Sequence, residues 1–321
     1  MRVGYLGPAG TYSYQAAVQH FPNANGEVEY LPQKSIGACF QSMNDGSVDY
    51  AIVPFENSTN GQVIFTFDLI VDWFVGGKAN FQVVGEEYVA IHHALVGYAA
   101  SINGIKEVHS HPQVWGQCRN ILAKLESPIQ VDESSTAAAV LAVSKLRSLS
   151  VAALAPLSAA HVHNVPIIQS PVEDDPSNTT RFLVLGRQHY SADRKIADRK
   201  IADKGMLLLA PHGDPSAPAG VARAMAELAA RGVGVAGVTS RPLGNGVGNG
   251  VGKVFVVDCF DGVAWGGVFG GSKAGGGQKI GIAIVGGFFF FFSFFFFFFF
   301  FFWVDSFRVW GWVLLMYKFA I

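Results

Sequence analysis

Short apolar runs alternate with segments of helical periodicity over the first 186 residues of the chain. The apolar runs predict five β-strands: Arg2–Leu6, Tyr50–Pro54, Phe81–Ile91, Ser150–Leu154 and Arg181–Leu185. The periodic segments predict five helices: Ser13–His20, Ser35–Asn44, Pro112–Leu125, Thr136–Lys145 and Leu157–Val162. Alternating strands and helices are typical of an α/β fold with a mostly parallel sheet. In such sheets, ligands bind beyond the carboxyl ends of the strands, where helices begin.

A charged segment separates this region from a second, shorter pattern. Residues 187–204 contain the pentapeptide Ala-Asp-Arg-Lys-Ile twice and predict a solvated linker. Region 205–261 then predicts a strand, a helix and two strands: Met206–Ala210, Ala217–Arg231, Val233–Arg241 and Lys253–Cys259. This order resembles the ACT-type regulatory domain, whose family topology is βαββαβ. The second helix and the last strand have no visible sequence, so we expect an incomplete ACT-like domain.

Residues 262–321 form a Gly- and Phe-rich tail. Fourteen of the 27 phenylalanines fall in Phe288–Phe292 and Phe294–Phe302. Ile280–Val304 carries no charge and is long enough to span a bilayer, so it is formally a transmembrane candidate. We favour translation of a T-rich nucleotide tract after a frameshift or from an unspliced intron, because homopolymeric Phe packs poorly as a helix. The tail is interpreted as non-native and the ACT-like region as truncated or frameshifted.

Composition excludes some classes of function. A net charge of -1 gives no electrostatic case for binding nucleic acid, and a membrane partner is expected only if the tail is genuine. Cys39, Cys118 and Cys259 lie far apart without metal-type spacing, which favours reduced thiols. No basic segment followed by an apolar run precedes the first predicted strand, so a secretory signal is not expected. We expect a cytoplasmic protein without a cofactor.

Three polar clusters stand where predicted helices begin. They are Gly7–Ser13, Ser110–Gln113 and Ser134–Thr136. Free backbone N–H groups and the positive end of the helix dipole make each position suitable for a carboxylate. Simple N-capping by Ser and Thr explains each cluster taken singly. Convergence of several clusters on one cleft would favour a small dianionic ligand.

A fourth cluster, Glu56, Asn57 and Ser58, follows the predicted strand Tyr50–Pro54 directly. Glu56 can orient donors or handle a proton, and its two neighbours can form hydrogen bonds. An Asx-type turn closed by Gly61 explains the same residues equally well. The sequence leaves the choice between a site and a turn open.

The histidines predict no metal site. No Asp, Cys or third His stands at ligand spacing from His92 and His93. We expect His93 to make a structural hydrogen bond. His111 is expected near the cleft, because it opens a predicted helix.

The motifs of one family match these segments in order and spacing: Gly7–Ser13, Val53–Ser58, Ser110–Gln113, Ser135–Ala137 and Thr180–Phe182. They resemble the prephenate dehydratase family. The resemblance implies a catalytic domain over 1–186 with two α/β lobes, similar to periplasmic solute-binding proteins. The expected lobes are about 1–78 plus 165–186, and 79–164. The implied reaction removes water and carbon dioxide from prephenate to give phenylpyruvate, on the route to L-phenylalanine.

The resemblance also implies roles for individual residues. Thr180 corresponds to the residue that the family regards as catalytic, and Glu56 and Ser58 are further catalytic candidates. The substrate-binding candidates are Thr11, Ser13, Asn57, His111, Ser135, Thr136, Arg181 and Phe182. A cation on the ring carboxylate would stabilise the ground state, because this group leaves as carbon dioxide. We therefore expect Arg181 to hold the pyruvyl carboxylate, which its fork of donors suits.

Two later segments resemble regulatory motifs of the family. Thr239–Pro242 resembles Glu-Ser-Arg-Pro with Thr in place of Glu, and Pro218–Val221 resembles a Pro-Gly-Ala-Leu turn. In the family these motifs bind phenylalanine at a subunit interface, which implies L-phenylalanine as an effector and a homo-oligomer. The allosteric candidates are Ala219, Gly220, Val221, Ser240, Arg241 and Pro242. An ordinary turn and strand explain both segments equally well.

Two other functions stay open. Arogenate dehydratases carry the same motifs and act on the amino analogue of prephenate. A bilobal domain can also bind a small anion without turning it over. Feeding prephenate and arogenate separately, and following the aromatic product by absorbance, discriminates all three.

Overall fold

The computed structural model describes residues 1–23, 26–75, 77–187, 204–210, 217–230, 232–242, 253–260, 279–284 and 311–319. The chain forms two compact units. The first comprises Met1–Thr66 and Glu86–Leu185, and the second comprises Phe67–Gly85 and Gly186–Ile321. Most of the predicted linker, residues 188–203, and most of the predicted tail lie outside the described residues.

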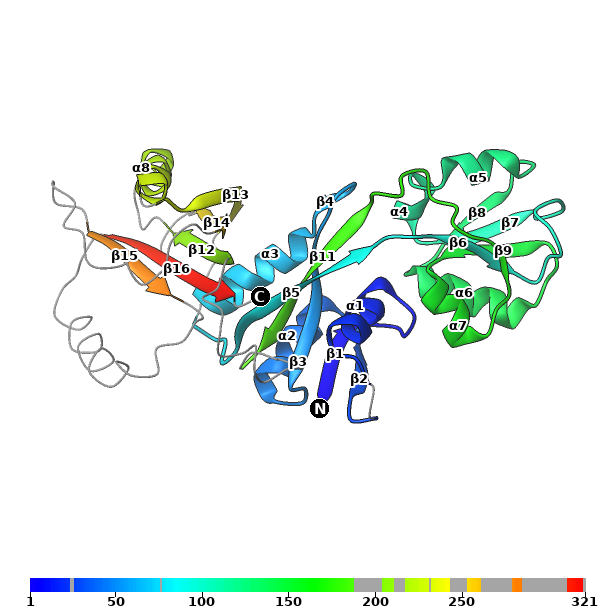
Figure 1. The fold of residues 1–321 in the computed structure, drawn as a ribbon, viewed down its shortest axis with the longest axis horizontal. Helices are drawn as coiled ribbons and strands as arrows, with labels where there is room; N and C mark the ends of the chain where they lie inside the picture. Colours follow the sequence, from blue (N-terminus) through cyan, green and yellow to red (C-terminus); the bar gives the residue numbers. More distant parts are fainter. Residues whose placement is uncertain are drawn as a thin grey trace. The chain divides into compact units, whose positions relative to one another are not determined.

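The first sheet has the strand order β2-β1-β3-β11-β5, with β4 beside β3 (Figure 1). Its strands are β1 (Arg2–Leu6), β2 (Glu29–Gln33), β3 (Tyr50–Asn57), β4 (Gly61–Gln62), β5 (Gln82–Ala90) and β11 (Thr179–Gly186). The helical segments between them are α1 (Tyr12–His20), α2 (Ile36–Asp45), α3 (Ile64–Ile70) and the π-helical η1 (Val71–Val75). Strand β1 runs parallel to β2 and β3, as the βα alternation predicts.

The second sheet has the strand order β10-β6-β9-β7-β8. Its strands are β6 (Ala94–Gly97), β7 (Glu107–Ser110), β8 (Ile129–Asp132), β9 (Val151–Ala155) and β10 (Ile167–Gln169). Its helices are α4 (Pro112–Trp115), α5 (Arg119–Lys124), α6 (Thr136–Leu146) and α7 (Leu157–His163). Strand β7 is parallel to β8 and β9, while β6 is antiparallel to β9 and to β10. The fold is therefore mixed α/β in both sheets.

Alternation along β6 and β9 divides the core of the second sheet into two clusters. Ala94 and Val96 face a cluster that includes Val140 and Val143 of α6. Leu95, between them in sequence, belongs to a cluster on the other side with Ile121 of α5. Because successive side chains of a strand point to opposite faces, each sheet face can bury its own layer of helices. The same alternation decides which residues of β11 reach the site.

Local sequence signals explain where the helices begin and end. Helix α2 starts after Ser35, whose hydroxyl accepts a hydrogen bond from the Ala38 backbone N at 3.1 Å. It ends at Gly46, which adopts a left-handed conformation with φ 80° that favours glycine. The predicted helix Pro112–Leu125 is instead two helices, because the backbone between α4 and α5 leaves the helical conformation at Cys118, with φ -131° and ψ 35°. The other predicted helices and strands agree with the structure within a few residues.

The two lobes begin and end at other residues than the sequence suggests. Strand β5 belongs to the first sheet, whereas the expected boundary assigns residues 79–90 to the second lobe. Strand β10 belongs to the second sheet, whereas residues 165–169 were expected in the first. The chain crosses between the sheets after β5 and again after β10, and Ile91 N donates to Asn178 O at 2.8 Å where these crossings meet. The predicted boundaries are wrong because they cut the chain before β5 and before β10.

The second unit contains a sheet with the order β13-β14-β12-β16-β15. Its elements are β12 (Lys204–Ala210), α8 (Ala217–Ala230), β13 (Gly234–Pro242), β14 (Lys253–Phe260), β15 (Lys279–Ile284) and β16 (Gly311–Phe319). The first four match the predicted strand-helix-strand-strand series. No final strand is predicted from the sequence, but β16 pairs antiparallel with β12 over the register Lys204↔Phe319 to Ala210↔Val313. Strand β13 leaves Val235 and Val238 exposed.

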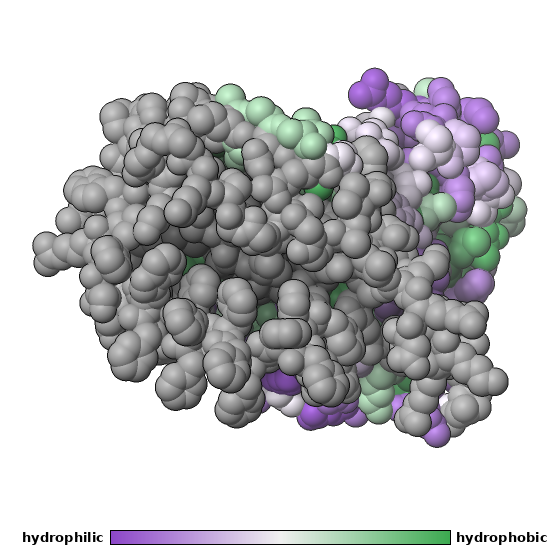
Figure 2. Space-filling model, turned by 60° about the vertical axis from the view of Figure 1, so that its left-hand side comes forward, coloured by the Kyte–Doolittle hydropathy of each residue, from purple (hydrophilic) through white to green (hydrophobic). Residues whose placement is uncertain are grey.

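The surface of the described residues is mixed in polarity (Figure 2), and the cysteines are buried. Figure 2 shows one face on which hydrophilic and hydrophobic described residues lie side by side. Within the described residues, no helix is long and apolar enough to cross a membrane. Cys39, Cys118 and Cys259 are free and buried, as expected for reduced thiols. Burial raises the pKa of each thiol to about 12, so these groups are poor nucleophiles.

Candidate active site

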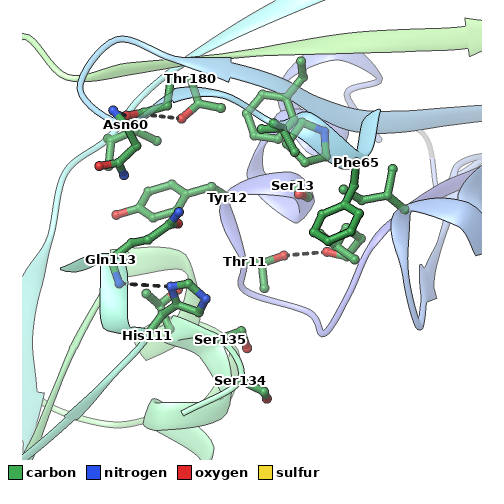
Figure 3. Close-up of a pocket in the computed structure, with 18 of the residues that line it drawn as sticks. Thr11, Tyr12, Ser13, Asn60, Phe65, His111, Gln113, Ser134, Ser135 and Thr180 are labelled. Carbon is green, nitrogen blue, oxygen red and sulfur yellow. Dashed lines mark hydrogen bonds between the residues drawn. The ribbon is translucent and has the colours of Figure 1, made fainter. Parts of the chain in front are cut away.

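A cavity of about 920 Å³ opens in the first unit, at the carboxyl ends of β1, β2 and β3. This is the edge where the sequence analysis expects a ligand. The lining includes eight of the predicted site residues: Thr11, Ser13, Asn57, His111, Ser135, Thr136, Thr180 and Phe182. Figure 3 shows Thr11, Ser13 and Thr180 together with His111 and Ser135 around the same space. Residues from both sheets therefore meet at one site.

The hydroxyl of Thr180 is held in one orientation by Asn57. The Asn57 Oδ1 accepts hydrogen bonds from the backbone N atoms of Thr59 at 3.0 Å and Asn60 at 2.8 Å. The amide is thereby fixed with Nδ2 toward Thr180, and this nitrogen donates to Thr180 Oγ1 at 2.8 Å. Because Thr180 Oγ1 accepts this bond, its own hydrogen is left to donate elsewhere. Asn57 thus forms the Asx-type turn that the sequence allows and also lies in the cavity lining.

Asn57 is the first of three amide side chains that hydrogen bonds link in series. Its Nδ2 also donates to Asn178 Oδ1 at 2.7 Å, and Asn178 Nδ2 donates to Gln117 Oε1 at 3.2 Å. Asn178 is 2% exposed and stands where the two crossing segments meet. The chain ties the Thr180 side of the cavity to Gln117, which lies between α4 and α5 of the second sheet's lobe. The polar wall is thus built from both lobes.

His93 and Tyr12 complete this wall. His93 Nε2 lies 2.9 Å from Gln117 Oε1, and His93 Nδ1 lies 2.9 Å from the Tyr12 hydroxyl. Burial lowers the pKa of His93, so the ring is neutral, with its hydrogen on Nε2 to donate to Gln117. The single hydroxyl hydrogen of Tyr12 is shared between His93 Nδ1 and the His92 carbonyl oxygen at 2.8 Å. His93 makes the structural hydrogen bonds that the sequence analysis expects.

Three predicted site residues cap helices at the cavity. Thr11 Oγ1 accepts from Tyr14 N at 3.3 Å, and Ser135 Oγ accepts from Ala138 N at 3.0 Å. His111 caps α4 through Nδ1, which accepts from Gln113 N at 3.3 Å. Burial lowers the pKa of His111, against a smaller opposing effect of Asp132, and a neutral ring suits this acceptor role. These three residues therefore cap helices and also converge on one cavity. The N-terminal ends of α1 and α6 give the cavity a positive electrostatic potential.

The two lobes approach closely beside this wall. Gly10 has φ +88°, and a Cβ atom there would lie 2.6 Å from Ala159 Cα in α7. Ser158 Oγ donates to Gly10 O at 2.8 Å. Only glycine permits both the backbone conformation and this separation. The Gly7–Ser13 segment thus sets how near the two lobes stand at the cavity.

Three predicted residues lie outside the lining. Arg181 points to the face of β11 opposite Thr180 and Phe182, because side chains alternate along a strand. Its Nε donates to Glu86 Oε2 at 2.7 Å and its Nη1 donates to Glu56 Oε1 at 3.0 Å. The guanidinium also stacks on Phe55, 5.2 Å from the ring centroid. The expected substrate contact of Arg181 is not what the structure shows, and Glu56 serves as its partner.

Ser58 joins strands rather than facing the cavity. Its Oγ accepts from Thr179 N at 2.9 Å and donates to Asn178 Oδ1 at 3.3 Å. Its backbone N donates to Thr179 O at 2.9 Å. Ser58 therefore fixes the start of β11, one residue before Thr180. Of the three catalytic candidates, Thr180 alone lines the cavity.

The cavity also contains residues that the sequence analysis did not single out. They are polar and aromatic side chains from several elements, including Tyr12, Lys34, Asn60, Phe65, Gln113 and Gln117. Tyr12 and Gln113 lie inside quoted motifs, so their positions were available as a signal. Phe65 is 74% exposed at the cavity, and no periodicity marks such a residue. Among the described residues, no group of three or more His, Cys, Asp or Glu could hold a metal ion.

The allosteric candidates lie in the second unit. Ala219, Gly220 and Val221 are in the first turns of α8 rather than in a separate turn. Ser240, Arg241 and Pro242 end β13. Arg241 Nε donates to Asp68 Oδ1 of α3 at 2.6 Å.

Comparison with known proteins gives one answer. The family model described as Prephenate dehydratase matches residues 3–190. A probable prephenate dehydratase of Saccharomyces cerevisiae is 38% identical, over 61% of this chain and 68% of its own length. Arogenate dehydratase 2 of Petunia hybrida is 34% identical, over 59% of this chain and 45% of its own length. The chain thus spans about two thirds of the first relative and less than half of the second.

A solved structure agrees with the sequence match. Prephenate dehydratase from Arthrobacter aurescens, in complex with L-Phe, superposes with a TM-score of 0.67 and 26% identity. The superposition covers 81% of this chain and 80% of that chain. The match includes the motif residues around the cavity described above. This chain belongs to the prephenate dehydratase family of carbon-oxygen lyases, whose place is in L-phenylalanine biosynthesis.

Proposed function

We propose that the cavity of the first unit carries out the reaction for which the family is named, with Thr180 as the proton donor. The observation that carries this proposal is the fixed Asn57 amide, which leaves the Thr180 hydroxyl hydrogen free to donate. Thr180 lines the cavity with capped helix starts on both sides. A dianionic substrate suits such a site.

The reaction breaks two bonds of the prephenate ring. The electron pair of the bond to the ring carboxylate moves into the ring as carbon dioxide leaves, and the bond to the 4-hydroxyl breaks. The electron pair of this second bond goes to the departing oxygen, which takes the Thr180 hydroxyl proton and leaves as water. Aromatic phenylpyruvate remains, and solvent returns a proton to the Thr180 oxygen. A positioned acid contributes typically ~10²–10⁴-fold to such a step. The Thr180 hydroxyl is a weak acid, but the Asn57 hydrogen bond to its oxygen stabilises the charge that develops there.

The experiment that tests this function uses the purified chain with prephenate and arogenate in separate reactions. Formation of phenylpyruvate from prephenate, followed by absorbance, is the expected result. Phenylalanine formed from arogenate alone would assign the alternative arogenate dehydratase activity, for which the Petunia relative is the precedent. Binding of both acids without product would mean a non-catalytic anion-binding protein. Heat-treated protein provides the background rate of the spontaneous reaction.

Asn57→Ala is expected to lower kcat by roughly tenfold, because a hydrogen bond of about 1–1.5 kcal/mol to the reacting hydroxyl is lost. KM should change little, because the variant keeps the helix starts that receive the anion. Steady-state rates of phenylpyruvate formation measure both constants. Asn120→Ala, on the exposed side of α5, is the matched control. An unchanged kcat in Asn57→Ala would show that Thr180 needs no orientation by this amide.

We further propose that L-phenylalanine is an effector and that the chain forms a homo-oligomer. The L-Phe complex of the Arthrobacter enzyme supports the first statement by analogy. The ACT-like order of β12, α8, β13 and β14, with candidates in α8 and β13, supports a regulatory role for the second unit. Val235 and Val238 of β13 are exposed, and this apolar surface supports a homo-oligomer in which another subunit covers it. Titrating L-phenylalanine into the assay, and measuring molar mass by light scattering, tests both statements.

A cytoplasmic location belongs to the same proposal. All three cysteines are free. Free thiols in this number are typical of proteins kept in a reducing compartment.

A further inference from the structure

The charges of the cavity lining are strongly one-sided. Among the described residues that line it, Lys34 is the sole Lys or Arg, and no Asp or Glu occurs. The two histidines of the lining, His93 and His111, have pKa values lowered by burial and carry no charge at neutral pH. A dianionic substrate in this cavity therefore meets one positive side chain.

The charge of Lys34 is not used by another residue. Lys34 stands between the end of β2 and Ser35, the cap of α2, and is exposed. In the described part of the chain, its ammonium makes no ion pair and no hydrogen bond. Arg181, which the sequence analysis expected to hold a carboxylate, is 4% exposed and engaged by Glu86 and Glu56. Arg181 therefore does not hold a substrate carboxylate, and the Lys34 ammonium is a cation that can.

The chemistry of the reaction determines which substrate carboxylate Lys34 can bind without lowering kcat. The ring carboxylate loses its charge as carbon dioxide leaves, so a cation on it would stabilise the ground state more than the transition state. The carboxylate of the 2-oxo acid side chain keeps its charge from substrate to product. A cation on this group binds substrate and transition state equally and lowers KM at no cost to kcat.

We infer that Lys34 binds the side-chain carboxylate of the substrate and makes the cavity selective for the 2-oxo acid over its 2-amino analogue. The amino analogue carries an ammonium group next to that carboxylate. This group would lie close to the Lys34 ammonium, and the described lining offers no carboxylate to pair with it. The inference rests on the proposed function, because it assumes that prephenate or arogenate occupies the cavity.

Lys34→Gln is expected to raise KM for prephenate about tenfold with kcat nearly unchanged, because one charge-assisted hydrogen bond is lost. Lys34→Arg should restore most of the affinity. Phenylpyruvate retains the side-chain carboxylate but lacks the ring carboxylate, so its Kd should weaken by the same factor as KM. The preference for prephenate over arogenate, as a ratio of kcat/KM, should fall in Lys34→Gln. Lys124→Gln, an exposed lysine at the end of α5, is the matched control.

The outcomes separate this inference from the function itself. If the wild-type chain turns over neither acid, the proposed function fails and the variants are not needed. If it turns over prephenate but Lys34→Gln keeps the wild-type KM, the inference is overturned while the function stands. A raised KM with an unchanged Kd for phenylpyruvate would assign Lys34 to the ring carboxylate and also overturn it. Equal thermal midpoints of the wild-type and variant chains exclude a folding defect as the cause.

Discussion

Arg181→Met lowers the free energy of unfolding by about 3–5 kcal/mol, because it removes the shared cation of two ion pairs, of which the one with Glu86 is buried. Arg181 and Glu86 are almost fully buried, and their Nε–Oε2 separation is 2.7 Å. Glu56, the second partner, is partly exposed at 3.0 Å and contributes less. The loss should appear in denaturant unfolding of the full chain as a lower midpoint.

Two further variants make this prediction specific. Arg119→Met removes an exposed arginine and should leave the midpoint unchanged. Arg181→Met combined with Glu86→Gln should recover part of the loss, because the more buried of the two carboxylates that lose the Arg181 ion pair is then uncharged. A wild-type midpoint in Arg181→Met, together with a raised KM, would instead support the substrate role that the sequence suggests.

Thr180→Val is expected to lower kcat by about 10²–10⁴-fold, with a small change in KM. Valine has nearly the shape of threonine but supplies no hydrogen to the departing oxygen. Steady-state rates of phenylpyruvate formation, at several prephenate concentrations, separate the two constants.

The neighbouring threonine provides a matched control. Thr179 Oγ1 donates to Ser177 O at 3.2 Å, and this side chain does not line the cavity. Thr179→Val should therefore keep kcat within a few fold, since it changes one hydroxyl at the adjacent position of the same strand. Equal losses in Thr179→Val and Thr180→Val would mean that the start of β11 matters for folding and that Thr180 has no special chemical role.

Much of the cavity could be predicted because its residues stand at junctions that the sequence marks. Thr11, Ser135 and His111 each follow a strand and open a helix, and such junctions gather at one edge of an α/β sheet. The junction is recognisable from small, polar and capping residues alone. The sequence motifs also identify Thr180 correctly as a lining residue.

The role of Arg181 could not be predicted from its place beside Thr180. Neighbours in a strand point to opposite faces, so the motif Thr180–Phe182 sends one member away from the cavity. The orientation of Arg181 follows only if β11 is known to begin at Thr179 and Glu86 is known to lie on the face opposite the cavity. Glu86 lies 95 positions away in sequence, which no local pattern reveals.

The lobe boundaries and Lys34 were missed for a related reason. Strands β6, β7 and β10 have four, four and three residues, too few for periodicity to show. Without β6 and β10, the crossings between the sheets cannot be located. Strand β2 contains Pro32, which weakens its strand signal, and Lys34 follows it as one exposed lysine among many.

A single-turnover experiment tests the central claim most directly. Excess enzyme is mixed with prephenate, and the rate constant of phenylpyruvate formation is measured for wild type, Thr180→Ser and Thr180→Val. The account predicts that serine, which keeps the hydroxyl, stays within about tenfold of wild type, whereas valine falls by about 10²–10⁴-fold while prephenate still binds. Phenylpyruvate formation by Thr180→Val at the wild-type rate constant would contradict the claim that this hydroxyl expels the leaving oxygen.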